Sequence, residues 1–401
     1  MPVPSEGRLC FVVTRNHGSL IDTMLFLHGT ELLKRSVLLL PPELHATHQT
    51  GLNADVREYR DFDDLIARID AERPSAVFLF CGYLLTSTGL VSKSQVKQLV
   101  RHLRSRGIPT VTNDPMWGLL GSRLSMRSEL PSRTLAQKVH KAFVEWLIPH
   151  RLRQSYHALH DLVHCYLAGV ERAIPPEQLR TMAFFNTGLI GAWKSPDPAA
   201  GDGSGSSAAT EEPYWLFILA ALDYEIQVNL HGKAAFIDSL VARFREANDA
   251  GRRAVLIAPG DCLTAVKASA GLGNVELIGF CDYERYVSLL MQAEYAFYWN
   301  IGSSSNLYRV FNGLPVFYYD RGHVSRWFPA FYDRTVQLLY HGHTPRILDH
   351  RDPLVPQRLR ALADEYRHAA SDIVRQLKRL PEPQAMVAQL LDGQRSPQGG
   401  A

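Results

Sequence analysis

Three consecutive hydroxyl side chains, Ser303, Ser304 and Ser305, follow Gly302 and are candidates for binding an anion. The residues before them, Tyr295 to Trp299, are typical of a short strand, and the residues after them are apolar at helical spacing. At the first turn of such a helix, unpaired backbone N–H groups and the positive end of the helix dipole accompany the hydroxyls. A phosphate group fits this chemistry. The alternative, in which a serine only caps the helix, needs one hydroxyl and stays open.

Cations near this loop would strengthen the binding of a phosphate. Arg309 lies one turn into the predicted helix, Lys233 lies in a predicted loop, and Arg321 follows the next strand. The predicted phosphate and nucleotide site comprises Gly302, Ser303, Ser304, Ser305, Asn306, Arg309, Lys233 and Arg321. For each cation, the alternative is a solvated surface position.

Two residues of the N-terminal half are candidates for a general base. His17 follows the predicted strand Leu9 to Thr14, and Asp114 follows a strand signal that ends at Thr112. His17 is preferred because a neutral imidazole accepts a proton near neutral pH, whereas an exposed Asp needs its pKa raised by burial. The alternatives are a helix cap for His17 and a turn residue before proline for Asp114.

Two patterns typical of metal sites have simpler explanations. Asp61-Phe62-Asp63 stands directly before an amphipathic helix, where Asp is favoured at the N-cap and in the first turn. His157, His160 and His164 share one face of a predicted helix, but the acidic partner pattern of zinc-binding helices does not accompany them. We therefore predict no metal site and no cofactor.

The elements that position these residues alternate between strand and helix. Apolar runs at Ser36 to Leu40 and Ala76 to Cys81, with a helix from Ser94, predict a parallel, doubly wound sheet. A second alternation of the same kind starts at Tyr214. From about Arg123 to Arg180 the strand signals vanish and helix is expected.

A chain of 401 residues exceeds what one core usually holds. We predict an α/β fold of two Rossmann-like, doubly wound domains facing a cleft. The expected parts are an N-terminal Rossmann-like domain with a helical insertion at 1–180, a linker or flexible loop at 181–212, a second Rossmann-like domain at 213–345, and C-terminal helices with a tail at 346–401. The carboxyl ends of parallel strands would then meet at the cleft, where ligands bind in such folds.

Composition excludes several classes of function. The net charge of +3 and the absence of a Lys or Arg block argue against binding to nucleic acid. Five scattered cysteines without a C-x-x-C pair are typical of reduced thiols, and no signal-peptide pattern is visible, so we expect a cytoplasmic protein. No apolar run is long enough to span a bilayer, which leaves peripheral contact with a membrane open.

The C-terminal half resembles the nucleotide-binding half of GT-B glycosyltransferases, and more narrowly the bacterial capsule-polysaccharide glycosyltransferases related to Kdo transferases. The residues that carry the resemblance occur in the family's order and are Asp223 to Gln227, Phe236 to Phe244, Val275 to Gly279, Asn300 to Ser305 and Gly313 to Val316. Two positions depart from the family. Pro259-Gly260-Asp261 replaces a His-Pro, and Tyr308 and Arg309 stand where many members place a carboxylate.

The resemblance implies a metal-independent glycosyltransferase that moves a sugar from a nucleotide-sugar donor to a glycan or other acceptor in polysaccharide biosynthesis. The serine loop would hold the donor phosphate, and His17 or Asp114 would be the catalytic base. Two alternatives remain: a sugar-nucleotide 2-epimerase of the same architecture, and a non-catalytic relative that binds a glycan or a partner.

Overall fold

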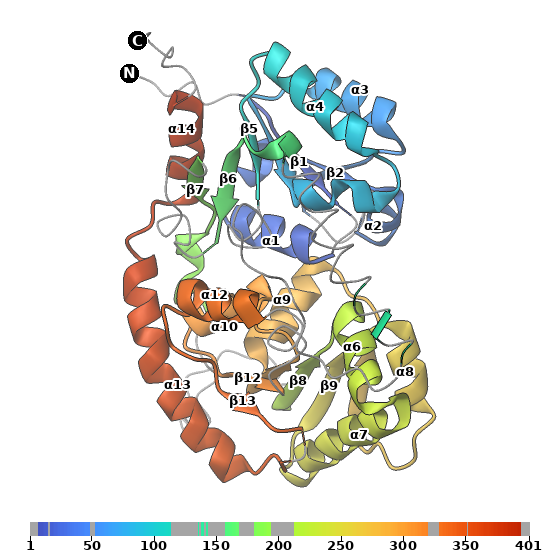
Figure 1. The fold of residues 1–401 in the computed structure, drawn as a ribbon. Coiled ribbons are helices and arrows are strands. Elements are labelled where there is room, and N and C mark those ends of the chain that lie inside the picture. The colour runs from blue at the N-terminus through green and yellow to red at the C-terminus, as the bar shows by residue number, and fades with distance from the viewer. Residues whose placement is uncertain are drawn as a thin grey trace. The chain divides into compact units, whose positions relative to one another are not determined.

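The computed structural model describes residues 7–14, 17–48, 53–113, 135, 138–139, 142, 157–167, 180–193, 212–319, 329–350 and 352–393. Among these residues the strands form two separate sheets of seven and six strands. Every pairing between the described strands is parallel, and most of the helices lie between successive strands in the sequence (Figure 1). The predicted architecture of two doubly wound α/β domains is confirmed.

The seven-stranded sheet has the order β3-β2-β1-β4-β5-β6-β7. Its strands are β1 (Leu9–Val13), β2 (Ser36–Leu40), β3 (Asp55–Glu58), β4 (Ala76–Phe80), β5 (Thr110–Thr112), β6 (Val163–Tyr166) and β7 (Thr181–Ala183). Five of them, β1, β2, β4, β5 and β6, are buried along their whole length. Continuous apolar runs of this kind are expected when helices cover both faces of a parallel sheet.

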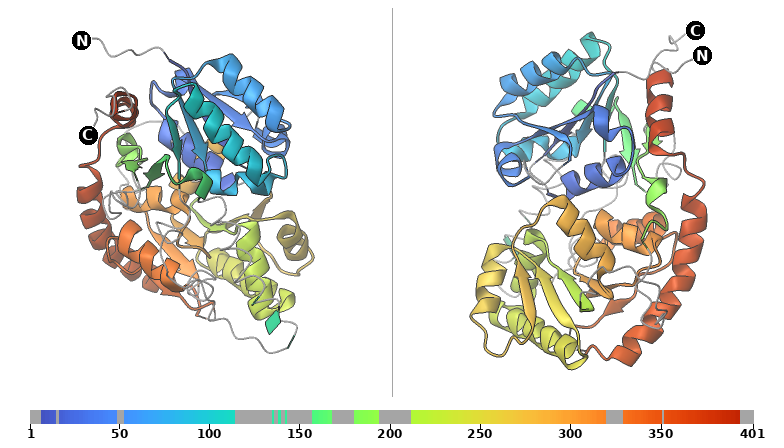
Figure 2. Two further views of the ribbon diagram at one scale, coloured as in Figure 1. Left: turned by 45° about the horizontal axis from the view of Figure 1, so that its top comes forward. Right: turned by 180° about the vertical axis from the view of Figure 1, so that it is seen from behind.

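Helices cover the two faces of this sheet in pairs. The pair α1 (His17–Leu27) and α2 (Pro42–His48) lies on one face, and α3 (Phe62–Glu72) and α4 (Lys93–Ser105) lie on the other (Figure 1). Three short 3-10 helices complete the description: η1 (Leu33–Arg35), η2 (Gly82–Thr88) and η5 (Thr187–Leu189). The last described helix, α14 (Pro383–Gly393), contacts β7 and so lies beside the N-terminal sheet (Figures 1 and 2).

Local capping explains where these helices begin and end. Asp61 caps α3 by accepting a hydrogen bond from the backbone N–H of Asp64, which confirms the capping explanation of the Asp-x-Asp pattern. Ser92 and Gln95 form a reciprocal capping box that starts α4. The side-chain amide of Asn186 donates to the carbonyls of Leu25, Phe26 and His28, and so satisfies the C-terminal end of α1 from far along the chain.

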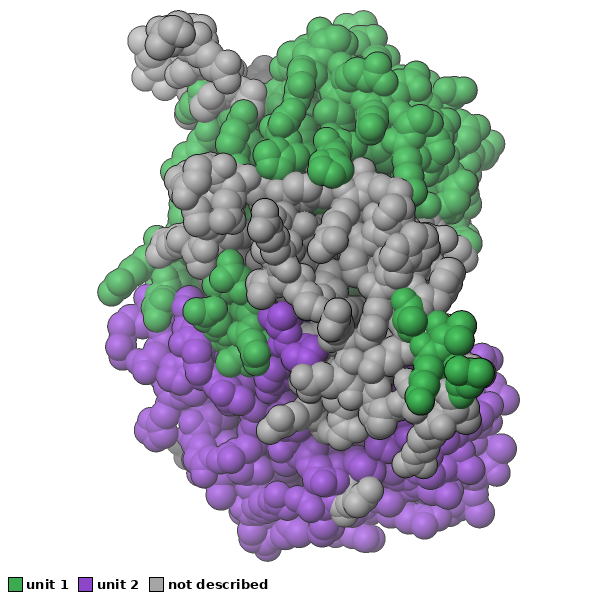
Figure 3. Space-filling model, viewed as in Figure 1, with its two compact units in different colours: residues 1–188, 333–339, 376–401 green, residues 189–332, 340–375 purple. Residues whose placement is uncertain are grey.

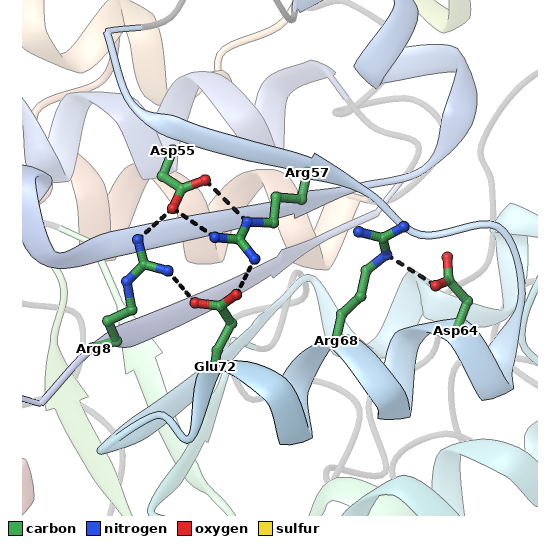
Figure 4. A network of polar contacts seen from close by, with 6 residues as sticks. All are labelled: Arg8, Asp55, Arg57, Asp64, Arg68 and Glu72. Carbon is green, nitrogen blue, oxygen red and sulfur yellow. Dashed lines mark hydrogen bonds and ion pairs between the residues drawn. The ribbon is translucent and has the colours of Figure 1, made fainter.

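A network of ion pairs joins β1, β3 and α3 (Figure 4). The carboxylate of Glu72, which is 4% exposed, contacts the guanidinium groups of Arg8 and Arg57. Asp55 also binds both arginines, at 3.1 Å from Arg57 Nε. β3 is an edge strand, and these ion pairs stabilise its packing against the neighbouring elements. Charged side chains on an edge strand also oppose pairing with a further strand.

One sequence expectation failed in the N-terminal sheet. Val163–Tyr166 lies in the stretch expected to be helical, but it forms the buried strand β6. His164 therefore does not share a helix face with His157 and His160. Its Nδ1 lies 3.0 Å from the carbonyl of Leu162 and its Nε2 lies 2.7 Å from the hydroxyl of Tyr83, while burial lowers its pKa to about 4. Pairing of Val163–Tyr166 with β5 and β7 outweighed the helical spacing of apolar residues in this stretch.

The six-stranded sheet has the order β10-β9-β8-β11-β12-β13. Its strands are β8 (Tyr214–Ile218), β9 (Arg253–Ile257), β10 (Val275–Ile278), β11 (Tyr295–Tyr298), β12 (Val316–Tyr319) and β13 (Ile347–Leu348). The helices are α6 (Ala221–His231), α7 (Lys233–Asp249), α8 (Gly260–Lys267), α9 (Tyr283–Gln292), α10 (Ser304–Phe311), α12 (Pro329–Leu339) and α13 (Pro356–Leu377).

The core of this half is aromatic. Alternate strand residues, among them Trp215, Phe217 and Phe297, point to one face and pack against α7, α8 and the first turns of α13. The rings of Phe217 and Phe297 stack at 4.8 Å between centroids. This packing fixes the strands whose carboxyl ends carry the candidate site.

Contacts between residues divide the chain into two compact units (Figure 3). Unit 1 consists of residues 1–188, 333–339 and 376–401, and unit 2 consists of residues 189–332 and 340–375. Within the described part of the chain, no helix has both the length and the apolar composition required to cross a bilayer.

Candidate donor site and its neighbours

The serine loop lies at the topological switch point of the six-stranded sheet. From β8 the chain proceeds outward through β9 to β10, and from β11 it proceeds in the opposite direction through β12 to β13. The neighbouring strands β8 and β11 are thus followed by helices that depart to opposite sides. Open α/β sheets bind their ligands in the crevice that this divergence creates at the carboxyl edge.

Hydrogen bonds between side chains and the backbone hold the loop between β11 and α10 in a defined conformation. The N–H of Gly302 donates to the side-chain oxygen of Asn300 at 2.8 Å. The amide of Asn306, which is fully buried, donates to the carbonyls of Asn300 and Ile301. The hydroxyl of Tyr340 reaches the carbonyl of Ile301 at 2.8 Å. Asn306 therefore shapes the loop from within.

The hydroxyl of Ser303 does not cap the helix that follows it, and the side chain of Ser304 lies outside what the structure describes. Helix α10 starts at Ser304, and its N-cap is Ser303. Within the described residues, the side chain of Ser303 makes no capping hydrogen bond. As at the start of every α-helix, the backbone N–H groups in the first turn of α10 have no acceptor carbonyl within the helix itself.

The hydroxyls instead form a network that runs toward the surface. Tyr286 donates to the hydroxyl of Ser305 at 2.9 Å, and that hydroxyl lies 3.0 Å from the hydroxyl of Ser303 and 3.3 Å from that of Tyr298. Ser305 is 3% exposed, whereas Ser303 is half-buried. Of these two serines, Ser303 is the one placed to meet a ligand.

Arg309 binds backbone carbonyls in the structure and is not placed to make the predicted phosphate contact. Its side chain is fully buried, and its guanidinium donates to the carbonyls of Leu290, Ala293 and Pro315. Burial lowers its pKa to about 10, which still leaves it charged at neutral pH. Arg309 thus closes the C-terminal end of α9 and the turn before β12, and we omit it from the candidate site.

Lys233 lies at the surface as the first residue of α7, not in a loop as predicted. Its charge acts on the thiol of Cys262, in the helix that follows β9, where it opposes the rise in pKa that burial causes. Lys233 therefore lies near the carboxyl edge of β9. Arg321 and Asp114 lie outside the described residues.

Two further residues lie at this edge and were not predicted as site residues. Phe280 follows β10 and is 43% exposed, an unusual position for a large apolar ring. Asp223 follows β8 in the first turn of α6, is 5% exposed, and accepts a hydrogen bond from the backbone of Ala220. Burial raises the pKa of Asp223 to about 7. An aromatic residue directly after the strand end Ile278-Gly279 was the available sequence signal for Phe280.

The seven-stranded sheet has its own switch point, between β1 and β4. His17 starts α1 just after β1, at the surface, and its Nδ1 lies 3.2 Å from Nε2 of His48. Partial desolvation lowers the pKa of His17, and the nearby Glu43 carboxylate opposes that effect. His17 is therefore neutral near pH 7, as a general base must be.

The neighbouring strand ends at this edge are tied together. Cys81, which follows β4, has a left-handed backbone with φ of 56°, and its thiol accepts a hydrogen bond from Ser19 at 2.9 Å. The side chain of Asn113, which follows β5, accepts the backbone N–H of Cys81. Among the described residues, no group of three or more His, Cys, Asp or Glu side chains is placed to hold a metal ion.

Comparisons with known proteins agree with this architecture. No protein-family model matches the sequence, and no curated protein matches it. Among solved structures, Os79 from O. sativa in complex with U2F and trichothecene aligns with 96% of this chain and 100% of its own, at 13% identity and a TM-score of 0.53. Os79 in complex with UDP aligns over the same shares at 11% identity and the same TM-score of 0.53.

This chain has the GT-B fold. The alignments extend over nearly the whole chain and include both sheets. At 11 and 13% identity they establish the fold, while the narrower resemblance to capsule-polysaccharide enzymes stays a prediction.

Proposed function

We propose that this chain is a glycosyltransferase that moves a sugar from a nucleotide-sugar donor to the hydroxyl of an acceptor. The observation that carries the proposal is the serine loop at the switch point of the six-stranded sheet, in a chain with the GT-B fold. The structure of Os79 with UDP supports the same class of donor.

The donor diphosphate would bind at the N-terminus of α10. Backbone N–H groups of its first turn and the hydroxyl of Ser303 would supply donors. Ser305, which accepts a hydrogen bond from Tyr286, could donate to Ser303 and leave the hydroxyl hydrogen of Ser303 available to the phosphate. Lys233 adds a cation at the same sheet edge, where it offsets charge on the departing nucleotide.

The nucleobase would lie toward β10. Three strand positions separate β10 from β11, which at the usual spacing is about 14 Å along the carboxyl edge. An extended nucleoside diphosphate with its phosphates on α10 can therefore place its base against the exposed ring of Phe280. A flat apolar ring is a suitable stacking partner for any nucleobase.

The reaction needs one proton transfer and one displacement. A base takes the proton of the acceptor hydroxyl as the acceptor oxygen attacks the anomeric carbon. The bond from that carbon to the diphosphate oxygen breaks, and the nucleoside diphosphate leaves with the electron pair. His17 is the preferred base, through Nε2, and Asp114 is the second candidate. Because the donor contacts are amides, hydroxyls and a cation, we propose transfer without a metal ion, to a glycan or similar acceptor.

Calorimetric titration of the full chain with CMP, UDP, GDP and dTDP tests the donor half of this proposal. We expect one nucleotide to bind, and Ser303→Ala to weaken it by about ten- to a hundredfold, since a charge-assisted hydrogen bond contributes roughly 1.5–3 kcal/mol. The matched control is Ser269→Ala, which removes a hydroxyl from the end of α8, bonded to the carbonyl of Ala265. Failure of every nucleotide to bind would contradict the proposal. If Ser303→Ala lowers the stability of the protein and leaves nucleotide affinity unchanged, Ser303 has a structural role and does not bind the phosphate.

A further inference from the structure

An aromatic ring from outside the serine loop packs against that loop. Phe331 lies in the first turn of α12 and is half-buried. Gly302 leaves open the position that a side chain would occupy beside this ring, since a Cβ added there would lie 3.7 Å from Cε1 and 3.9 Å from Cζ of Phe331. Carbon atoms at such separations are in van der Waals contact. The ring of Phe331 therefore borders the loop at which we propose that the donor diphosphate binds.

A buried tyrosine holds the end of α12 to the same loop. Tyr340 follows α12 directly, and its hydroxyl donates to the carbonyl of Ile301 at 2.8 Å. The same hydroxyl lies 2.7 Å from the hydroxyl of Tyr318 in β12. Tyr340 is 2% exposed, so these hydrogen bonds are shielded from water. The position of Phe331 is thus fixed relative to the loop and to β12.

The strand order places Phe331 and Phe280 on opposite sides of the serine loop. Seen from β11, where the loop begins, β8, β9 and β10 lie on one side and β12 lies on the other. Phe280 follows β10, whereas α12 follows β12. In the binding mode proposed above, the nucleoside extends from α10 toward Phe280. The donor sugar is attached to the other end of the diphosphate, so it extends toward β12 and α12.

A phenyl ring is chemically suited to contact a sugar ring. A pyranose presents C–H groups on its faces and hydroxyl groups around its edge. An aromatic face can cover the C–H groups and leave the hydroxyls free for hydrogen bonds, which is the usual division between apolar and polar contacts in ligand sites. Phe331 belongs to the same compact unit as Gly302, so this contact needs no residue of the other unit.

We propose that Phe331 is a donor-binding residue, against which the pyranose ring of the nucleotide sugar packs. This inference rests on the proposed function and adds to it a residue that contacts the sugar itself. Phe280 and Phe331 then have separate roles, because the first contacts the nucleobase and the second contacts the sugar. It follows that Phe331 contributes to the binding of a nucleotide sugar but not to the binding of the free nucleotide.

Calorimetric titration of the full chain with matched pairs of ligands tests this difference. The pairs are UDP with UDP-glucose, GDP with GDP-mannose, and dTDP with dTDP-glucose. For the nucleotide that the wild type binds, we expect Phe331→Ala to weaken the nucleotide sugar by about five- to twentyfold, as removal of one stacking ring does, and to change the affinity for the free nucleotide less than about twofold. Phe331→Leu keeps apolar packing on the loop but lacks the flat face, so it should have the same selective effect.

Two further variants serve as controls. Phe280→Ala should weaken the free nucleotide and the nucleotide sugar by the same factor, because both carry the base. Tyr332→Ala removes the neighbouring half-buried ring of α12 and should leave both affinities unchanged.

The possible outcomes separate this inference from the proposed function. Equal weakening of both ligands in Phe331→Ala and Phe331→Leu would show that the ring only supports the loop, and would overturn the inference. Unchanged affinity for both ligands, or a wild type that binds a free nucleotide but none of the nucleotide sugars, would overturn it as well. A wild type that binds no nucleotide would contradict the proposed function itself.

Discussion

Replacing Arg309 by lysine should destabilise unit 2 strongly although the substitution keeps the charge. The arginine fork donates to three buried carbonyls, those of Leu290, Ala293 and Pro315, with distances of 3.0 Å to Ala293 and 3.1 Å to Pro315. A lysine has a single nitrogen, and we expect it to reach one of them from this position. At least one of the carbonyls of Leu290 and Ala293 then loses its arginine donor in a site with no access to water, whereas that of Pro315 still accepts the backbone N–H of Ala296 at 3.4 Å.

The magnitude follows from the one or two carbonyls left without a donor. Each buried acceptor left unpaired costs roughly 1–3 kcal/mol, so we expect a loss of about 1–6 kcal/mol in the free energy of unfolding. For a unit of this size, each kcal/mol lowers Tm by about 2–4 °C, which predicts a decrease of at least about 2 °C. Calorimetric melting at pH 7.5 measures it. Arg375→Lys, at a position with a side chain 71% exposed, is the control and should leave Tm unchanged.

The same variant separates the structural role from the sequence-based prediction of a phosphate contact. A lysine in place of a phosphate-binding arginine would lose the bidentate contact and weaken nucleotide binding, and it would not affect folding. An Arg309→Lys protein with unchanged Tm and nucleotide affinity lowered tenfold or more would refute the buried-cap reasoning. That result would instead support a contact between Arg309 and the phosphate.

Three other outcomes follow from the structure. Glu72→Gln should lower the free energy of unfolding in urea by about 1–3 kcal/mol, because two arginines lose a nearly buried charged partner, whereas Glu31→Gln, at an exposed pair, should cost less than about 0.5 kcal/mol. The pKa of Asp223 is raised to about 7 in the folded state, so the buried carboxyl costs no folding free energy below pH 4, where it is protonated in both states. As pH rises toward 7, the free energy of unfolding falls, because the unfolded state releases this proton more readily than the folded state. Asp223→Asn should therefore gain Tm relative to wild type at pH 8 but not at pH 4, and an equal shift at both would show that the carboxyl does not titrate as described. Nucleotide affinity should be the same with and without EDTA, and its disappearance in EDTA would contradict metal-independent binding.

Local sequence signals were sufficient for most of the fold. Strand β2 has the predicted bounds, because buried parallel strands are continuous apolar runs that local composition reveals. The serine loop was also visible, since a strand, a glycine-serine turn and an amphipathic helix are all short-range features. The strands that the sequence reading missed are short or partly polar, as β3 and β13 are, or lie in a stretch with helical spacing, as β6 does.

What the sequence could not decide is the direction in which a long side chain points and which distant residue it meets. Arg309 looks like a surface cation from its spacing, but burial of α10 against α9 turns its guanidinium toward carbonyls up to 19 residues away. Ser303 and Ser305 are equivalent in sequence, and only the position of Tyr286 on another helix distinguishes the buried hydroxyl from the one near the surface. His17 and His48 stand 31 residues apart, and the sheet alone brings them together, because parallel strands β1 and β2 pair and place the helices that follow them on one face.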